Sequence, residues 1–442
     1  MRTVLFLGWS TKGRDIEIDL PLMYFFEKIL KWKVIHQTIF NLPEVVKTKP
    51  DLVLMTNTTG AVRQVEVSRL IENSGFPFFS HVSEGMFREI DIEEFVWGWG
   101  KNEKRMSESL SMLWSQKSYD MAVSNFPDTA KKFRVSGGIG FDKYKILDTR
   151  KLDSGNYKKC VGYAAFDFHN IVLKKKIHIE NMGEDAFKQL MSLATLSNKI
   201  LHHLVKNNPD ILFFLKQHPG DSENCVSLEF ENITNYENIR ILKSGVSIVD
   251  VIGSSDIWLN INSSTNLEAW LMGKPSISFL TNEEGFSSDV INGSLIEDDC
   301  CCIQNYIDEY YLSGRIQDFE IKKGIRSGLI SDYIGFSDGL NHVRYMSFLK
   351  PFIENVENGI LQRGDWNISI KYRGKAYLQR LLYRFANGKY HLPFFKKWAS
   401  YYHIYNVDKL VVAKDKYYEA MDFFYSPRRK EIQDVYENYS KE

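Results

Sequence analysis

Short apolar runs alternate with helical patterns along the first part of the chain. Thr3–Leu7 is an apolar run of strand length, and Asp19–Leu30 then places its apolar residues at helical spacing. Further short runs predict strands at Lys33–His36, Leu52–Met55, Phe76–Val82, Met121–Ser124 and Phe133–Val135. Strands joined by helical crossovers imply a parallel sheet covered on both faces. Residues 1–150 are therefore predicted to form one doubly wound, Rossmann-like α/β domain.

The polar segment Asp148–Asn156 interrupts this pattern and predicts a domain boundary. The pattern then starts again. The expected strands are Cys160–Ala165, Ile211–Lys216, Asn238–Leu242, Ile257–Ile261 and Ser276–Leu280, and the expected helices are Asp185–Lys206, Ser247–Ile252 and Asn266–Met272. Residues 151–345 are predicted to be a second Rossmann-like domain, and residues 346–442 a helical extension rich in basic and aromatic residues.

Two doubly wound α/β domains that face a cleft, followed by C-terminal helices, define the GT-B architecture. Domains of this kind bind ligands at the carboxyl ends of their parallel strands. The chemistry is therefore expected in the loops that follow the strands. The resemblance to GT-B enzymes, whose second domain usually contacts the donor, implies a donor in the second domain and an acceptor in the first.

Charge separates the C-terminal segment from the rest of the chain. The formal net charge is zero, so no overall field favours nucleic acid as a partner. Residues 362–442, however, hold 16 Lys and Arg against 9 Asp and Glu, and 12 of the 23 tyrosines. Basic, aromatic helices lie on anionic membrane surfaces or pack on a domain with a solvated basic face. Both interpretations stay open: the segment binds a membrane surface, or its helices pack on the second domain.

Compartment and redox state follow from two absences in the sequence. The N-terminal apolar run is too short for a signal peptide, and no stretch has the ~18 apolar residues of a membrane span. The five cysteines show no zinc-knuckle spacing, which favours reduced thiols. We expect a cytoplasmic protein, in possible peripheral contact with the inner face of the cytoplasmic membrane through its C-terminal segment.

A histidine follows the most apolar strand of the second domain, in Lys216-Gln217-His218-Pro219-Gly220. An imidazole at the carboxyl end of a strand can donate a hydrogen bond to the phosphate of a nucleotide leaving group. Lys216 and Pro219 flank it and join the donor-binding candidates. A structural histidine that ends the strand is the alternative.

Hydroxyl residues follow the strand Ile257–Ile261, in Asn262-Ser263-Ser264-Thr265-Asn266. Such residues cap helices, and free N–H groups at a helix start bind anions. Ser263, Ser264 and Thr265 are therefore candidates for holding a donor phosphate, with simple capping as the alternative. His218 and Ser263 end strands of the same predicted sheet, with one short β–α pass between them, so both are expected to face the same cleft.

An acidic residue beside a glycine follows the strand Phe76–Val82 of the first domain. Glu84 is placed to act as a general base toward an acceptor hydroxyl, and Gly85 leaves room for substrate to approach. His81 is expected to orient Glu84 or to bind the acceptor. A solvated loop carboxylate is the alternative, and Glu283-Glu284-Gly285 is a rival copy of the pattern.

A Gly/Ser/Thr-rich loop, Gly8–Asp15, follows the first strand. Ser10, Lys12 and Arg14 are candidates for the acceptor side or for anion binding. The loop lacks the spacing of a P-loop and of a dinucleotide fingerprint. Gly137–Gly140 is interpreted as the turn between domains. No Asp-x-Asp pair flanked by strands appears, so a reaction without a metal or other cofactor is expected.

Together these residues resemble a bacterial surface-carbohydrate (surface polysaccharide) biosynthesis family. They are similar in plan to the GT-B transferases that use CMP-sugars, namely bacterial sialyltransferases and Kdo transferases. Those families carry an acidic-Gly motif, a His-Pro motif and a Ser/Thr motif in this order. The matching residues are Glu84-Gly85, His218-Pro219 and Ser263-Ser264-Thr265. The resemblance covers roughly residues 1–345.

Two elements depart from the family pattern. Val135–Asp142 resembles the family's Val-x-Gly-Asn-Pro-x-Phe-Asp turn but differs at Gly138 and Ile139. Ser83 stands where a second acidic residue is usual.

The resemblance implies an inverting, metal-independent transfer of a sugar from a CMP-activated donor, a nonulosonic acid or Kdo, to a surface glycan or lipid-linked glycan. Glu84 would be the base, His218 would contact the CMP phosphate and assist its departure, and Ser263 and Ser264 would bind that phosphate.

Other functions stay open. A CDP-glycerol-type glycerophosphotransferase of teichoic-acid-like polymer synthesis also resembles the second domain, through its His-Pro and a Ser-Ser followed by an acidic residue (Ser263-Ser264 and Glu268). A non-hydrolysing sugar epimerase and a non-catalytic binding module are further alternatives.

Overall fold

The structure is a computed structural model of the 442-residue chain, which divides into two compact units. The first unit combines Met1–Leu147 with Ser331–Glu442, and the second is Asp148–Ile330. The structure describes residues 1–9, 14–85, 89, 92–97, 105–218, 226–243, 245–261, 263–280, 289–361, 364–368, 370, 374, 377–378 and 407–441.

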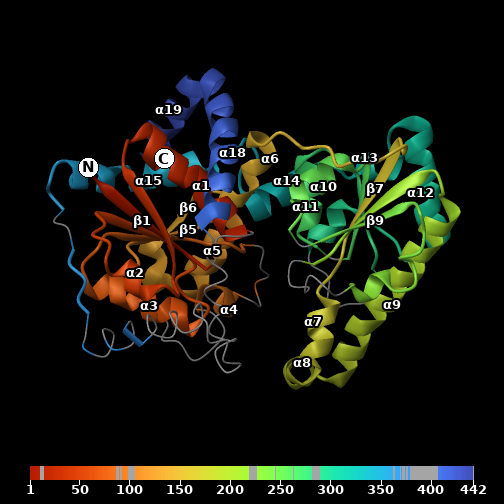
Figure 1. The fold of residues 1–442 in the computed structure, drawn as a ribbon, viewed down its shortest axis with the longest axis horizontal. Coiled ribbons are helices and arrows are strands. Elements are labelled where there is room, and N and C mark those ends of the chain that lie inside the picture. The colour runs from red at the N-terminus through yellow and green to blue at the C-terminus, as the bar shows by residue number, and fades with distance from the viewer. Residues whose placement is uncertain are drawn as a thin grey trace, which may run out of the picture. The chain divides into compact units, whose positions relative to one another are not determined.

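The first unit is built on a parallel sheet with the strand order β2-β1-β3-β4-β5-β6 (Figure 1). Its strands are β1 (Thr3–Gly8), β2 (Lys33–Thr38), β3 (Leu52–Thr56), β4 (Phe78–His81), β5 (Leu110–Leu113) and β6 (Phe133–Val135). Its helices are α1 (Arg14–Tyr24), the π-helix η1 (Phe25–Ile29), α2 (Leu42–Val45), α3 (Val62–Asn73), α4 (Ile92–Trp97), α5 (Gln116–Asn125), η3 (Pro127–Lys132), η4 (Ile139–Phe141), α6 (Lys143–Ile146), α15 (Asn341–Glu357), α18 (Val407–Tyr425), η8 (Ser426–Arg428), α19 (Arg429–Asn438) and η9 (Tyr439–Lys441).

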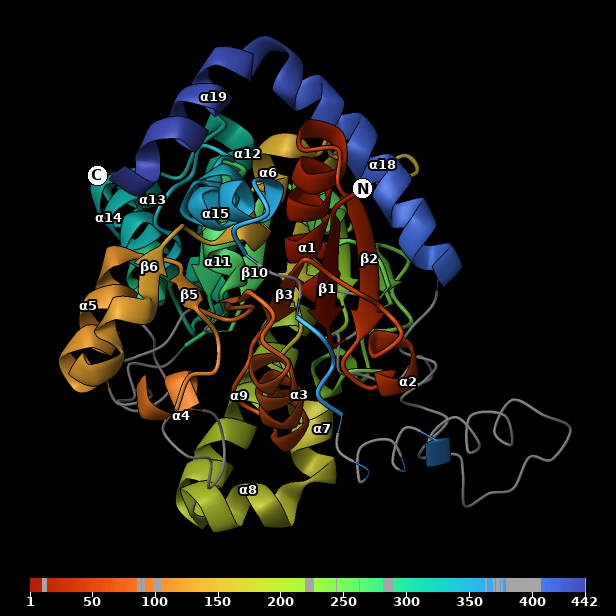
Figure 2. The same ribbon diagram turned by 90° about the vertical axis from the view of Figure 1, so that its left-hand side faces the viewer.

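Alternation along β1 explains why both faces of this sheet are covered. Successive side chains of a strand point to opposite faces, and Val4 and Phe6 pack in one core while Leu5 and Leu7 pack in another. The first core includes residues of α1, α15 and α18, and the second includes residues of α3. Figure 2 shows α1, α15, α18 and α19 together over the sheet.

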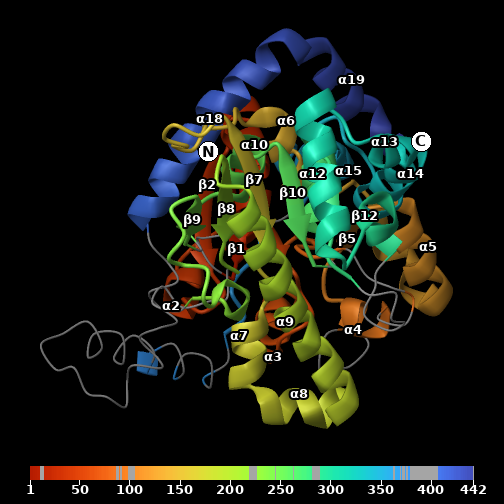
Figure 3. The same ribbon diagram turned by 90° about the vertical axis from the view of Figure 1, so that its right-hand side faces the viewer.

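The second unit repeats the arrangement with the strand order β12-β11-β10-β7-β8-β9. Its strands are β7 (Lys159–Ala164), β8 (Ile211–Lys216), β9 (Ile239–Leu242), β10 (Ile257–Asn260), β11 (Ser276–Ser278) and β12 (Leu295–Ile296). Its helices are α7 (Phe168–Leu173), α8 (Lys175–Met182), α9 (Glu184–Asn207), η5 (Leu228–Phe230), α10 (Ile248–Ser254), α11 (Thr265–Leu271), η6 (Asp289–Gly293), α12 (Cys300–Ser313), α13 (Gln317–Ile321) and α14 (Lys323–Ile334), which runs past the end of the unit. Figure 3 shows α9 and α12 beside this sheet.

These two parallel sheets with helices on their faces confirm the predicted fold class, two Rossmann-like domains with C-terminal helices. Most predicted strands and helices coincide with observed ones, and β8 has the predicted limits. Met121–Ser124 was wrongly predicted as a strand. These residues lie in α5, because Ser115 accepts a hydrogen bond from Ser118 N and starts a helix at Gln116.

The C-terminal segment belongs to the first unit, whereas one of the two interpretations left open by the sequence packed its helices on the second domain. Residues 331–345, which were assigned to the second domain, also belong to the first unit. Apolar packing explains why the segment belongs to the first unit. Side chains of α18, namely Tyr417, Tyr418 and Met421, are buried in the core that also holds Val4 and Phe6 of β1.

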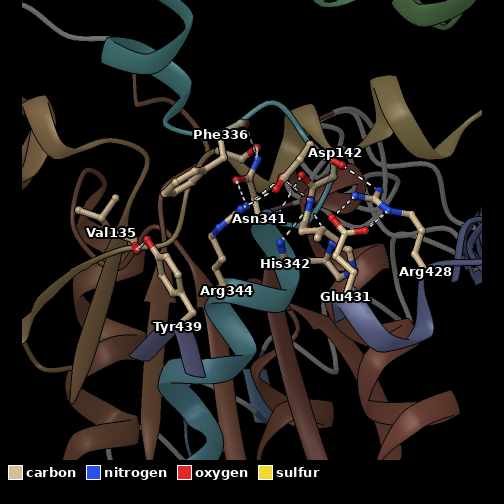
Figure 4. A network of polar contacts seen from close by, with 12 residues as sticks. Val135, Asp142, Phe336, Asn341, His342, Arg344, Arg428, Glu431 and Tyr439 are labelled. Atoms are coloured by element: carbon tan, nitrogen blue, oxygen red, sulfur yellow. Dashed lines mark hydrogen bonds and ion pairs between the residues drawn. The ribbon is translucent and has the colours of Figure 1, made fainter. Parts of the chain in front are cut away.

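A buried network of hydrogen bonds holds the C-terminal helices against the first unit (Figure 4). The carboxylate of Asp142 accepts hydrogen bonds from the backbone N–H groups of Asn341 and His342, at 3.2 and 2.9 Å. His342 Nδ1 lies 2.7 Å from Asp142 Oδ2, and His342 Nε2 lies 2.8 Å from the Tyr425 hydroxyl. Asp142 and His342 are fully buried. Three distant segments of the chain are thus joined through the Asp142 carboxylate and the His342 ring.

Arg428 belongs to the basic triplet Arg428-Arg429-Lys430 and also takes part in this docking. It donates to the Asp338 backbone carbonyl at 2.9 Å and pairs with Glu431 (Figure 4). Most of the other basic and aromatic residues of the C-terminal segment, including residues 381–385 and 394–398, lie outside the described residues. In the described part of the chain, no helix is long and apolar enough to span a membrane.

We predict that Asp142→Ala lowers the free energy of unfolding of the first unit by about 3–5 kcal/mol, because it leaves His342 and two backbone donors buried without their acceptor. Urea-dependent hydrogen exchange of peptides from β1 and α15 measures this unit alone. Asp434→Ala, at an exposed position of α19, is the control and should change the value by less than about 0.5 kcal/mol. Equal effects of the two substitutions would contradict the assigned role of Asp142.

Candidate functional site

An aspartate and a histidine meet at the carboxyl edge of the second sheet. His218 follows β8 and Asp167 follows the neighbouring strand β7, to which β8 is paired in parallel. His218 Nδ1 lies 3.0 Å from Asp167 Oδ1, and each side chain is 35% exposed. Asn170 Nδ2 donates to the same Asp167 oxygen at 2.7 Å. The carboxylate therefore orients an imidazole that is still accessible to a ligand.

Glu229 anchors the loop that carries Asp167. It is completely buried, and it accepts hydrogen bonds from the Tyr163 hydroxyl at 2.8 Å and from Phe166 N at 2.9 Å. Burial, reinforced by the Glu229 carboxylate, raises the pKa of Tyr163 well above its usual value. The tyrosine thus stays a hydrogen-bond donor, and the backbone just before Asp167 is held in place.

The hydroxyl cluster lies at the same edge, but β7 separates it from His218. The strand order β10-β7-β8 puts the residues after β10 on the far side of Asp167. Ser263 Oγ accepts from Thr265 N at 3.2 Å, and Thr265 Oγ1 accepts from Trp258 Nε1 at 3.0 Å. These bonds are those of a structural turn before α11, which has only seven residues. Phosphate binding by Ser263, Ser264 and Thr265 stays a prediction.

The remaining donor-side candidates lie beside His218 in the sequence. Lys216 is 5% exposed, and its Nζ donates to the Gln217 carbonyl at 3.1 Å, so the ammonium group is inside the sheet edge. Pro219 and Gly220 lie outside the described residues, as does the rival acidic motif Glu283-Glu284-Gly285.

In the first unit, Glu84 is exposed and Gly85 is buried. A Cβ on Gly85 would lie 2.3 Å from Cδ2 of the Trp114 indole, which donates through Nε1 to the Val82 carbonyl at 2.8 Å. Packing against Trp114 therefore demands the glycine, which the sequence interpretation assigned to substrate access. The role of Glu84 as a base stays a prediction.

His81 belongs to a buried network that the sequence did not predict. Its Nε2 lies 3.1 Å from Asp19 Oδ1 and 3.0 Å from Thr56 Oγ1. His36 Nε2 lies 3.3 Å from the other Asp19 oxygen. Burial alone would raise the pKa of Asp19, but the two histidines outweigh it and hold this pKa below its usual range. Asp19 is thus an ionised acceptor for the histidines.

A second buried carboxyl, Glu108, lies on the other side of the same strands. Its Oε1 accepts from Thr58 Oγ1 at 2.7 Å and from Ser80 Oγ at 2.9 Å. Burial raises the pKa of Glu108 above its usual value, although these two hydroxyls lower it. Glu108 and His81 both line a cavity of about 30 Å³.

The loop after β1 is only partly described. Ser10 and Lys12 lie outside the described residues, and of Arg14 only the backbone is described, as the first residue of α1. Their acceptor-side roles stay predictions.

Sequence reasoning missed Asp167, Asp19 and Glu108. Asp167 carried a usable signal, because it follows a predicted strand of the same sheet as His218. Asp19 and Glu108 carried none, since the first lies within a predicted helix and the second precedes a strand that was not predicted.

The described residues contain no group of three His, Cys, Asp or Glu side chains that could hold a metal ion. Cys160, Cys300, Cys301 and Cys302 are free thiols, and burial raises the pKa of Cys160 to about 11.

Comparisons with known proteins bear on the fold. No protein-family model and no curated protein matches the sequence. A solved UDP-N-acetylglucosamine 2-epimerase has a TM-score of 0.53 to this chain at 13% identity, covering 84% of this chain and all of its own. MnaA from S. aureus, solved with UDP, has a TM-score of 0.52 at 14% identity, and the match covers 80% of this chain and 97% of MnaA. The UDP-GlcNAc 2-epimerase from Neisseria meningitidis bound to UDP-GlcNAc has a TM-score of 0.50 at 13% identity, and the match covers 81% of this chain and 100% of the epimerase. The chain therefore has a GT-B-type fold.

We predict that Glu108→Gln becomes increasingly stabilising, relative to the wild type, as pH rises from about 4. A carboxyl whose pKa is raised by folding binds more protons in the folded state, so wild-type stability falls with pH between the unfolded value, about 4.3, and the folded one. Urea unfolding of both proteins between pH 4 and 8 measures the difference. The exposed Glu419→Gln should show a flat difference, and a flat difference for Glu108→Gln as well would contradict the raised pKa of the buried carboxyl.

Proposed function

We propose that the protein is an enzyme that binds a pyrimidine-nucleotide-activated sugar through its second unit and transfers the sugar to an acceptor hydroxyl. The observation that carries this proposal is the Asp167–His218 pair at the carboxyl edge of the second sheet, where doubly wound domains bind nucleotides. The fold of this chain is one that nucleotide-sugar enzymes use, which supports the substrate class.

With Nδ1–H donating to Asp167, a doubly protonated His218 imidazole would donate a hydrogen bond from Nε2 to a phosphate oxygen of the donor. Negative charge grows on this oxygen as the sugar leaves, and an oriented donor that needs no rearrangement stabilises it most. Asp167 would keep the ring in one orientation. Since this stabilisation needs no metal, we propose a metal-independent reaction, which a chelator should not inhibit.

The nucleotide divides the proposal into two forms. The resemblance in the sequence favours CMP as the leaving group, with a nonulosonic acid or Kdo as the sugar and a glycan or lipid-linked glycan as the acceptor. Two of the similar solved structures were obtained with UDP or UDP-GlcNAc, which favours a UDP-sugar. The fold is compatible with both.

Epimerisation of a UDP-sugar is the second candidate. Two of the similar structures are described as UDP-GlcNAc 2-epimerases, and each is covered in full by this chain. An epimerase returns the nucleotide sugar with C2 inverted, whereas a transferase releases the nucleotide.

The direct test is titration calorimetry of the full-length protein with UDP, CMP and CDP, followed by product analysis with the matching nucleotide sugars. We predict binding of one nucleotide and a loss of affinity of about 10-fold or more in His218→Ala, because a hydrogen bond to a charged group contributes about 1.5–3 kcal/mol. Asp167→Asn should lower kcat more than nucleotide affinity, since it removes the carboxylate that orients the His218 ring but leaves the imidazole itself in place.

His178→Ala, on α8 and away from the sheet edge, is the matched control and should bind like the wild type. Free nucleotide as the product would support transfer, and a C2 epimer would support the second candidate. Absence of nucleotide binding, or equal binding by His218→Ala, would contradict the proposed site.

A further inference from the structure

Two short helices at one end of the second unit expose large apolar side chains. Figures 1 and 3 show α7 and α8 together at this end, with α9 running back from them along the sheet. The exposed side chains are Val172 and Leu173 of α7 and Ile177 and Met182 of α8, with exposed fractions of 43%, 70%, 55% and 36%. We call residues 172–182 the α7–α8 tip.

Lysines are interspersed with these apolar residues. Lys174, Lys175 and Lys176 follow Leu173 directly, and all three are exposed. Lys176 Nζ lies 4.0 Å from Oε1 of Glu180, the one acidic residue of the tip. Within the described chain, Lys174 and Lys175 form no ion pair. The tip is therefore both apolar and positively charged.

The acidic residues just beyond the tip are balanced by a lysine of their own helix. Glu184 Oε1 and Asp185 Oδ1, at the start of α9, lie 3.3 and 3.7 Å from Lys188 Nζ. Their charge is thus largely compensated on α9. The positive excess stays with the tip.

Exposed apolar side chains beside unpaired lysines complement the surface of an anionic membrane. The apolar groups enter the boundary between headgroups and acyl chains, while the ammonium groups contact lipid phosphates. A stable protein interface takes about 20–30 residues from each side, and the tip spans only residues 172–182. A lipid surface needs no shape complementarity, so a surface of this size is sufficient.

We propose that the α7–α8 tip is a docking surface for an anionic membrane. Leu173 and Ile177 insert into the headgroup region, and Lys174 and Lys175 bind the phosphates around them. The contact is peripheral, because the helices are short and charged.

The tip is joined directly to the candidate nucleotide site. α7 begins at Phe168, the residue after Asp167, which pairs with His218. Because α7 has six residues, it is about 9 Å long. Membrane contact would therefore hold the proposed donor site of this unit near the lipid surface. This consequence rests on the proposed function, whereas the membrane contact itself does not.

The test is sedimentation of the full-length protein with lipid vesicles, in the absence of nucleotide. We expect binding to vesicles made of phosphatidylcholine and phosphatidylglycerol in equal parts, and much weaker binding to phosphatidylcholine alone, because the lysines need anionic headgroups. Added salt should weaken the binding, because it screens exposed charges.

Leu173→Ser combined with Ile177→Ser should weaken vesicle binding by about 10-fold or more, because the membrane then covers less apolar area. Leu312→Ser is the matched control. Leu312 is 91% exposed on α12 of the same unit, and its replacement should leave the binding unchanged.

Lys174→Ala combined with Lys175→Ala should also weaken the binding by about 10-fold or more, and it should reduce the dependence on salt. Lys323→Ala, at an exposed position of α14, is the control for charge and should bind like the wild type. Hydrogen exchange with anionic vesicles should show protection in peptides that cover residues 168–183.

Four results would overturn the inference. The first is no binding to anionic vesicles, and the second is equal binding to both kinds of vesicle. The third is loss of binding in Arg429→Ala with Lys430→Ala but not in the tip variants, which would assign the contact to the C-terminal segment. The fourth is self-association without lipid that Leu173→Ser with Ile177→Ser abolishes, which would show that a second copy covers the tip.

The proposed function is tested separately. Vesicle binding is measured without nucleotide, so a protein that binds anionic vesicles through the tip but binds no nucleotide would contradict the proposed function alone. A protein that binds nucleotide but no vesicles would overturn the docking surface alone.

Discussion

The buried carboxylate of Asp142 is the constraint on which the first unit depends. It accepts the first two N–H groups of α15 and the ring of His342, which in turn meets Tyr425 of α18. Because Asp142 precedes the crossing into the second unit and α15 follows the return, this contact closes the first unit around its own sheet. The helices it fixes cover the sheet face that bears Val4 and Phe6 and bring Tyr345 beside His81.

Each unit places an Asp–His pair near the carboxyl ends of its strands, but the two pairs differ in burial. Asp167 and His218 are each 35% exposed, which suits contact with a ligand phosphate. Asp19 and His81 are nearly inaccessible, and the hydrogen bonds of His36 and His81 hold the pKa of Asp19 below its usual range despite its burial.

The sequence predicted the fold well because apolar periodicity is local. Ile211–Lys216 reads as a buried strand and is β8, and Asp185–Lys206 lies within α9. The sequence-based prediction failed at Met121–Ser124, because the helix cap at Ser115 outweighs the short apolar run. The docking of α18 on the first unit was beyond local reasoning, because only the three-dimensional core distinguishes one sheet from the other as its partner.

The candidate site shows the same limit. His218 and Glu84 were selected as candidates because each follows a strand, but the residues around them are set by contacts between strands. Asp167 reaches His218 through the pairing of β7 with β8, and Gly85 is required by Trp114 rather than by a substrate. Periodicity therefore locates the edge of a sheet, while the chemistry at that edge depends on which loops the sheet order makes neighbours.

The measurement that tests the central claim most directly is hydrogen exchange of the full-length protein with and without saturating UDP or CMP. The account predicts slower exchange in peptides that cover the ends of β7 and β8, residues 161–169 and 211–218, with β1 and β3 of the first unit unchanged. Protection confined to peptides of the first unit would contradict the assignment of the nucleotide to the second.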